Sequence, residues 1–164
     1  MEGIKPMVNI PSHCEPKKTN RWLGRFPVKL GIQEWWQYET SRPSVFFDGE
    51  DVIYNPITFK LRDVIGPSSS QAINKIMIGM TNHLSHIEDS HATTKKIKEE
   101  FKEERENGFD YTLELLDPTG HVIEEWAIIG CKLVSIDYGD LSMDSDNLCE
   151  ITMVIQPKTF IQLY

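Results

Sequence analysis

The chain has 164 residues, of which 25 are acidic and 17 are basic, so its formal net charge at pH 7 is -8. This length suits one well-packed domain, and the hydrophobic fraction of 40% excludes a wholly disordered chain. The negative charge argues against a protein that binds nucleic acid tightly, because phosphate contacts require clustered Lys and Arg. It is compatible with a conduit past which DNA slides without sticking.

The three cysteines, Cys14, Cys131 and Cys149, are an odd number without a CxxC spacing. Neither a zinc knuckle nor a closed disulfide framework is therefore indicated. No apolar stretch of the sequence reaches the roughly 18 to 20 residues that a membrane helix needs, and the first residues lack the apolar core of a signal peptide. We therefore expect reduced thiols, no membrane partner, and a protein made and kept in a reducing cytoplasm.

Residues 1–20 are expected to form an extended N-terminal arm, because Pro6, Pro11 and Pro16 interrupt regular structure there. In an assembly such an arm can become ordered on a neighbouring subunit. The rest of the chain, residues 21–164, is expected to form a single domain.

Trp35–Ser41 alternates large and polar side chains and stops before a proline, which predicts a strand. In a strand, Trp35 and Trp36 would point to opposite faces, so that one could enter the core. The other would need a cover, and a subunit interface is one such cover. An ordinary amphipathic surface tryptophan is the alternative.

A short hairpin is predicted next, because Val45–Phe47 and Val52–Tyr54 flank an Asp-Gly pair that suits a tight turn. Ile57–Arg62 alternates and predicts a further strand. Ser68 and the glutamine three residues later fit a capping box, so a helix should start there. It should run to about Leu84 and pack on the sheet through one apolar stripe.

Residues 86–108 are dominated by charge, with Ile97 and Phe101 forming one narrow apolar line. They predict a charged helical insertion that ends at Gly108. Three strands should follow, over Phe109–Leu116, residues 121–138 with a break at Gly130, and Glu150–Gln156. The first two should form a hairpin through the turn at residues 117–120, which contains Pro and then Gly.

Catalytic signatures are weak. His83, His86 and His91, with the neighbouring Glu88 and Asp89, have metal-ligand chemistry, but the spacing lacks the HExxH glutamate, and a solvated helix end is the simpler interpretation. The serines after Gly66 are explained by helix capping, and the Gly-rich phosphate-binding motifs are missing. The aspartates between residues 137 and 150 do not follow a calcium-loop spacing, so a solvated turn is preferred.

Short segments in a characteristic order resemble the tail tube proteins of contractile-tailed bacteriophages. The likeness covers about residues 20–156 and includes Leu115-Leu116-Asp117-Pro118-Thr119-Gly120 and Asp137-Tyr138-Gly139-Asp140-Leu141. The other segments are Asn20-Arg21-Trp22, Arg25-Phe26-Pro27, Gly31-Ile32-Gln33-Glu34-Trp35, Ser41-Arg42-Pro43, Leu61-Arg62-Asp63, Glu125-Trp126 and Gly130-Cys131.

The resemblance implies a mainly β fold with one or two helices, a two-sheet β-sandwich or partial barrel. Subunits of this kind form β-lined hexameric rings, which stack into the tube through which genome DNA leaves the virion. The needle protein of type VI secretion and the tubes of other contractile injection systems share this architecture. The expected partners are further copies of the chain, a sheath protein, and baseplate or terminator proteins. DNA would pass without specific binding.

We therefore expect a non-enzymatic virion protein without cofactors, assembled in the host cytoplasm and located in the tail. Two alternatives stay open: a tube-like baseplate initiator or tail terminator protein, and a small metal-dependent hydrolase that uses the histidine cluster. The arm and residues 44–55 should touch neighbouring subunits. The candidate channel-lining residues are Gln37, Glu39, Glu150 and Thr152. The candidate interface residues are Trp22, Trp35, Trp36, Phe46 and Phe47.

Overall fold

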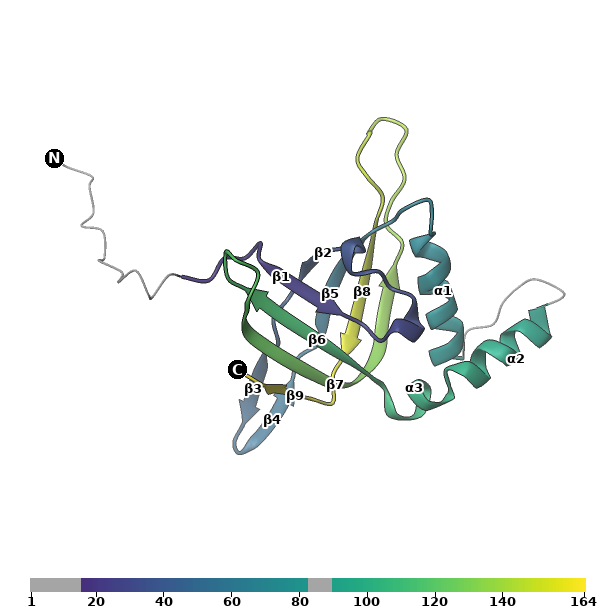
Figure 1. Ribbon diagram of the computed structural model, residues 1–164. Helices are drawn as coiled ribbons and strands as arrows, with labels where there is room; N and C mark the ends of the chain where they lie inside the picture. Colours follow the sequence, from purple (N-terminus) through teal and green to yellow (C-terminus); the bar gives the residue numbers. More distant parts are fainter. Residues whose placement is uncertain (1–15, 83–89) are drawn as a thin grey trace.

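The computed structural model describes residues 16–82 and 90–164, and in these ranges the protein is mainly β with three helices (Figure 1). The strands are β1 Trp22–Arg25, β2 Gln37–Thr40, β3 Val45–Asp48, β4 Asp51–Tyr54, β5 Ile57–Arg62, β6 Phe109–Leu116, β7 Val122–Asp137, β8 Glu150–Gln156 and β9 Thr159–Gln162. The helices are α1 Ser69–Met80, α2 Ser90–Glu100 and α3 Lys102–Asn107, and short 3-10 turns span Val28–Leu30 and Glu34–Trp36.

Seven of the strands form one antiparallel sheet, and the long strand β7 belongs to both halves of it. The first part of β7 pairs with β6 and β9, and β6 pairs with β1, which gives half-sheet A. The second part of β7 pairs with β8, followed by β5 and β2, which gives half-sheet B. Gly130 separates the two parts with a φ of 69°, a value that glycine adopts at little cost. β3 and β4 form a separate two-stranded hairpin.

The two half-sheets face each other across an aromatic core. Phe59 of β5 and Tyr111 of β6 are both fully buried, and their ring centroids are 4.8 Å apart. Phe26 packs on both rings, at 5.1 and 4.6 Å. The predicted two-sheet sandwich or partial barrel is therefore correct in part: one bent sheet supplies both layers, and in the described residues no backbone ladder closes a barrel.

Among the described residues, no backbone ladder joins β1 to β2, the two outer strands of the bent sheet. Buried side chains connect these strands instead. Gln37 of β2 donates a hydrogen bond from Nε2 to the Gly24 carbonyl of β1, at 2.8 Å. The Tyr111 hydroxyl donates to Gln37 Oε1, at 3.0 Å. A methyl group on Gly24 would overlap the Tyr111 hydroxyl, so glycine is what allows the edges to approach. Because burial raises the pKa of Tyr111, its hydroxyl stays protonated and remains a donor.

We expect Tyr111→Phe to lower the free energy of unfolding by about 1–3 kcal/mol, because it leaves the buried Gln37 carbonyl without its donor. Urea denaturation of the monomer measures this loss. Tyr138→Phe is the matched control: Tyr138 is 38% exposed, and its change should stay within about 0.5 kcal/mol. Equal losses in the two variants would contradict a structural role for this bridge.

Helix α1 begins where the sequence predicts. The Ser68 hydroxyl accepts a hydrogen bond from the Gln71 amide at 3.4 Å, and Ile73 and Ile76 of the apolar stripe are buried. The helix ends at Met80, before the predicted end at Leu84, which lies outside the described residues.

The described part of the charged segment, residues 90–108, is largely helical and packs on the domain through α1. Phe101, between α2 and α3, is 1% exposed and lies against Gly79 of α1, where a Cβ would overlap its ring. Lys98 Nζ donates to the carbonyls of Ile78 and Thr81, at 3.1 and 2.7 Å. Arg105 donates to the Gly79 carbonyl at 2.9 Å. These cations satisfy carbonyls that the end of a helix leaves free.

The structure differs from the local predictions in two respects. Trp35 and Trp36 lie in a 3-10 turn and not in a strand, and β2 starts at Gln37, two residues after the predicted start. Their division between core and surface is nevertheless as expected, with Trp36 1% exposed and Trp35 54% exposed. β1 and β9, of four residues each, were not predicted.

Candidate assembly surfaces

The β3–β4 hairpin carries large apolar side chains on its surface. Phe46 is 51% exposed and Phe47 is 68% exposed, and Val52 and Ile53 of the facing strand are also exposed. The hairpin extends away from the main sheet (Figure 1). The register pairs Phe46 with Ile53 on one face of the hairpin and Phe47 with Val52 on the other. Isolated two-stranded hairpins are at best marginally stable in water, and large apolar side chains exposed on both faces of one indicate an interaction site.

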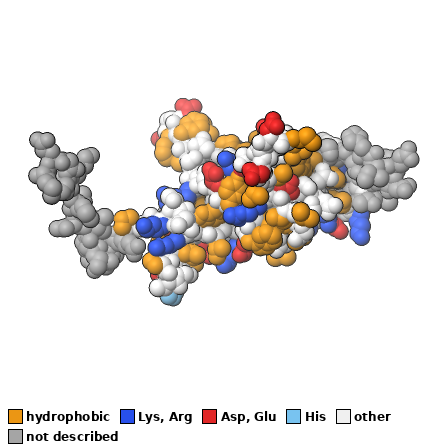
Figure 2. Space-filling view, turned by 90° about the horizontal axis from the view of Figure 1, so that it is seen from above, with side chains coloured by type: hydrophobic (Ala, Val, Ile, Leu, Met, Phe, Trp, Pro, Cys, Tyr) orange, Lys and Arg blue, Asp and Glu red, His pale blue; other side chains and the backbone are white. Residues whose placement is uncertain are grey.

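The loop between β7 and β8, residues 138–149, is a second unusual surface. Its Leu141, Met143 and Leu148 are almost completely exposed. Asp140, Asp144 and Asp146 lie between them in the sequence. Figure 2, seen from the end that carries this loop, shows hydrophobic and acidic side chains side by side. The spacing of its aspartates predicts a solvated turn, and the exposure of its apolar residues is an additional feature that the sequence pattern does not indicate.

The hairpin and this loop lie at opposite ends of half-sheet B. The register pairs Arg62 of β5 with Glu150, where the loop returns to the sheet. At the other end of β5, the Thr58 carbonyl accepts from the Ser41 amide, and the hairpin base is closed by a bond from the Asn55 amide to the Ser44 carbonyl. The subunit therefore has a loop end and a hairpin end (Figure 1).

Half-sheet B also has two edges without a backbone partner among the described residues. Residues 132–137 of β7 pair with β8 along one side, and β2 pairs with β5 along one side. A groove of about 310 Å³ runs along the β7 edge, between α1 and the exposed Val134. Unpaired strand edges are templates for pairing with another chain.

The outward face of half-sheet B is polar and carries balanced charge. Along β5, Ile57, Phe59 and Leu61 are buried, so the residues between them point outward. The register places Lys60 between Glu39 and Thr152, with 3.6 Å between the Lys60 ammonium and the Glu39 carboxylate. The charged residues of this face are Glu39, Asp137 and Glu150 against Lys60, Arg62 and Lys132.

Three of the four candidate channel residues share this face, namely Glu39, Glu150 and Thr152. Gln37 does not: it is 7% exposed and is hydrogen-bonded inside the subunit, so it cannot line a channel. Alternation along β2 could not reveal this, because the polar side chain is buried as the bridge between two strand edges.

The candidate interface residues are also divided. Trp35, Phe46 and Phe47 are exposed, whereas Trp36 is in the core and cannot reach a neighbour without unfolding. Trp22 is half-buried and lines a pocket.

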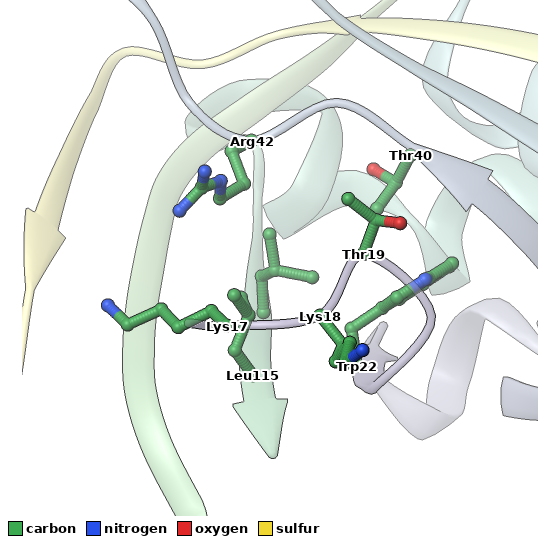
Figure 3. Close-up of a pocket in the computed structure, with 8 residues that line it drawn as sticks. Lys17, Lys18, Thr19, Trp22, Thr40, Arg42 and Leu115 are labelled. Carbon is green, nitrogen blue, oxygen red and sulfur yellow. The ribbon is translucent and has the colours of Figure 1, made fainter. Parts of the chain in front are cut away.

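That pocket lies between the ends of β1 and β2 and has a volume of about 190 Å³ (Figure 3). We call it the basic pocket, and its lining consists of Lys17, Lys18, Thr19, Trp22, Thr40, Arg42, Leu113 and Leu115. Its cations were not identified from the sequence, where the nearest signal was the Lys-Lys pair that precedes Trp22.

Glu124 of β7 holds two of these cations in place. It is 3% exposed, and its carboxylate accepts from Lys17 Nζ and from Trp126 Nε1, both at 2.6 Å. Arg42 Nη1 also donates to this carboxylate and lies 3.3 Å from Glu124 Oε2. Burial alone would raise the pKa of Glu124, but these hydrogen bonds outweigh it and hold the pKa below its ordinary value. The carboxylate is thus ionised at neutral pH.

We expect Glu124→Gln to lower the free energy of unfolding at about pH 6 by about 2 kcal/mol, because it removes charge-assisted hydrogen bonds. Since the folded-state pKa lies below the unfolded one, this stabilisation is complete above the unfolded pKa and is lost as pH falls through the folded pKa. When the pH is lowered from about 6 to about 3.5, the free energy of unfolding measured by urea denaturation should fall less in Glu124→Gln than in the wild type. The control is the exposed Glu99→Gln, and identical profiles in all three proteins would contradict the role of Glu124.

No group of three or more metal-ligand side chains is present in the residues that the structure describes. The histidine cluster at residues 83–91 lies outside the side chains that are described. Among the helices of residues 16–82 and 90–164, none is long and apolar enough to cross a membrane.

Comparison with known proteins identifies the fold. No family model and no curated protein matches the sequence. Among solved structures, a chain of the sheath/tube terminator of the extracellular contractile injection system PVC has a TM-score of 0.55 and 13% identity, over 92% of this chain and 98% of that chain. A chain of the tube terminating cap of the anti-feeding prophage has a TM-score of 0.54 and 12% identity, over 99% and 98%.

A third match is a chain of the PVC sheath–tube complex, with a TM-score of 0.52 and 12% identity over 90% of each chain. At these identities the likeness is one of fold. This protein therefore has the fold of components of contractile injection systems, as its resemblance to tail tube proteins predicted.

Proposed function

We propose that this protein is a structural subunit of a contractile tail, which forms homo-hexameric rings that stack into the inner tube. The observation that carries the proposal is the fold, which extends over nearly the whole length of this chain and of the injection-system chains it matches. The role is geometric and not catalytic.

The ring would close through the free edges of half-sheet B. In a ring, the β7 edge of one copy meets the β2 edge of the next, so each contact is heterologous and rotation closes it. Backbone pairing there would satisfy the polar groups that both strands leave open. The outward faces of the four strands, with Glu39, Thr152 and Glu150, would then line the channel.

Stacking of rings would use the two ends of the subunit. The exposed hairpin, residues 44–55, would contact the adjacent ring together with the N-terminal arm, residues 1–20. Trp35 is a further candidate for a contact between copies. Sheath and baseplate or terminator proteins are the expected partners of the tube.

Electron microscopy of the purified protein tests the proposal directly. A tube subunit should give long hollow tubes built from six-fold rings. A protein that stays monomeric over the whole accessible concentration range, with a native fold, would contradict the proposal.

A tail terminator or cap is the second candidate. It is favoured by the match to the anti-feeding prophage cap, which covers 99% of this chain and 98% of that one. The same images distinguish the two functions, since a terminator should give isolated rings where a tube subunit gives filaments.

The cargo we propose is genome DNA, and the charge of the channel wall leads to a prediction. The six charged residues of the proposed wall sum to zero, so they should neither attract nor strongly repel phosphate. Assembled tubes should therefore fail to retain duplex DNA at low salt, as measured by co-sedimentation. Retention that weakens steeply with added salt would show a basic lumen and would contradict this assignment of the wall.

A further inference from the structure

The basic pocket has unused capacity to bind an anion. Lys17 and Arg42 share the single carboxylate of Glu124, and Lys18 forms no ion pair with a carboxylate of the described residues. An ammonium has three donors and a guanidinium has five, more than the contacts to Glu124 that the described residues show for Lys17 and Arg42. Figure 3 shows the charged heads of Lys17 and Arg42 on the same side of the pocket. The site therefore suits a further carboxylate.

The floor of the pocket is apolar, because Trp22, Leu113 and Leu115 contribute to its lining. A volume of about 190 Å³ accommodates a side chain of ordinary size but not a folded element. Its best ligand is therefore an irregular segment in which an apolar side chain has acidic neighbours.

Two described segments of the chain combine exposed apolar and acidic side chains. The loop at residues 138–149 exposes Leu141 and Met143 almost completely, with Asp140 and Asp144 beside them. The β3–β4 hairpin is the second such segment. The positions of the loop and the hairpin relative to the pocket indicate which of them can bind there.

The basic pocket lies at the hairpin end of half-sheet B. Arg42 follows the Ser41 amide that bonds the Thr58 carbonyl, whereas the loop returns to the sheet at Glu150, at the opposite end of β5. When copies stack head to tail, the hairpin end of one copy faces the loop end of the next. The hairpin and the pocket are then on the same side of the contact, so the loop is the segment that can reach the pocket.

We propose that the loop at residues 138–149 of one copy docks into the basic pocket of the copy stacked on it. An apolar side chain at the loop tip packs on Trp22, Leu113 and Leu115, and its aspartates bind the pocket cations. This inference rests on the proposed tube function, to which it adds a specific electrostatic contact between stacked rings. Glu124 then also acts in assembly, because it positions two of the cations that bind the incoming loop.

Charge reversal on the full-length protein tests the electrostatic part. Lys18→Glu and Asp144→Lys should each raise the critical concentration for assembly, measured by sedimentation, by about fivefold or more, because each places like charges in the contact. The combined variant should recover at least part of the loss. Lys96→Glu, at an exposed position of α2, is the control of equal charge change.

The outcomes separate the two proposals. Assembly of the wild type, with Lys18→Glu and Asp144→Lys indistinguishable from Lys96→Glu, would overturn the docking contact and leave the tube function intact. Failure of the wild type itself to assemble would overturn the tube function first. Unchanged thermal unfolding of the monomers shows that a loss of assembly does not come from misfolding.

Disulfide trapping tests the geometry independently of charge. In a background in which Cys14 and Cys149 are replaced by Ser, Thr19→Cys at the pocket and Met143→Cys at the loop tip should crosslink adjacent copies when assembled rings are oxidised. Crosslinking of Thr19→Cys to Phe47→Cys, with none to Met143→Cys, would assign the pocket to the hairpin and overturn the proposal.

Discussion

Phe101→Ala is expected to lower the free energy of unfolding by about 3–4 kcal/mol, although the residue belongs to the most highly charged segment of the chain. The phenyl ring is 1% exposed and fills the space above Gly79, and the Lys29 ammonium lies 5.7 Å from its centroid. Truncation removes the buried ring and leaves a cavity between α1, α2 and α3. Urea denaturation of the monomer measures the loss.

Glu103→Ala is the matched control, because this exposed residue of α3 should change stability by about 0.5 kcal/mol or less. If the free energy of unfolding of Phe101→Ala also stays within about 1 kcal/mol of the wild type, α2 and α3 contribute little to the stability of the fold. The expected large loss would instead make the charged segment an integral part of the fold, held by an apolar anchor and by the helix-capping cations Lys98 and Arg105.

Strands with one buried face and clear turns were predictable almost to the residue. The bounds of Phe109–Leu116 and Glu150–Gln156 agree with the structure, because a period of two and the Asp117 turn determine them. Asp117 Oδ1 accepts from the Thr119 and His121 amides, at 2.9 and 2.8 Å, which fixes the reversal locally. Local chemistry of this kind can be read without knowledge of the rest of the fold.

Features that depend on contacts between distant segments were not predictable. β1 and β9 are too short to carry a periodic signal, and they are strands because β6 and β7 offer them edges. Gln37 was expected on a wet surface because glutamine is polar. It is buried because Gly24 and Tyr111, 13 and 74 residues away in sequence, satisfy its amide.

The net charge of the chain also says little about any one surface. Acidic residues concentrate at the turn of the hairpin, in the loop at residues 138–149 and on α3. The outward face of half-sheet B, by contrast, has three carboxylates and three cations. The acidic composition of the chain therefore reflects these three regions more than the proposed channel wall.

Phe47→Asp should strongly weaken assembly while leaving the monomer folded. Phe47 is 68% exposed on the hairpin, so its replacement should change monomer stability by no more than about 1 kcal/mol. In an interface, however, a buried aromatic side chain contributes about 2–4 kcal/mol, and a charge in its place would be desolvated. The critical concentration for assembly should therefore rise by at least about 30-fold, as measured by sedimentation and by electron microscopy.

Val28→Asp provides the control, because Val28 is 97% exposed on a 3-10 turn outside the hairpin. It introduces the same charge in place of an exposed apolar side chain and should assemble like the wild type, since only a position inside an interface is sensitive to that charge. If Phe47→Asp forms rings and tubes as readily as Val28→Asp, the hairpin is not a contact between subunits. The exposed aromatic surface would then have to be covered by a different protein of the tail.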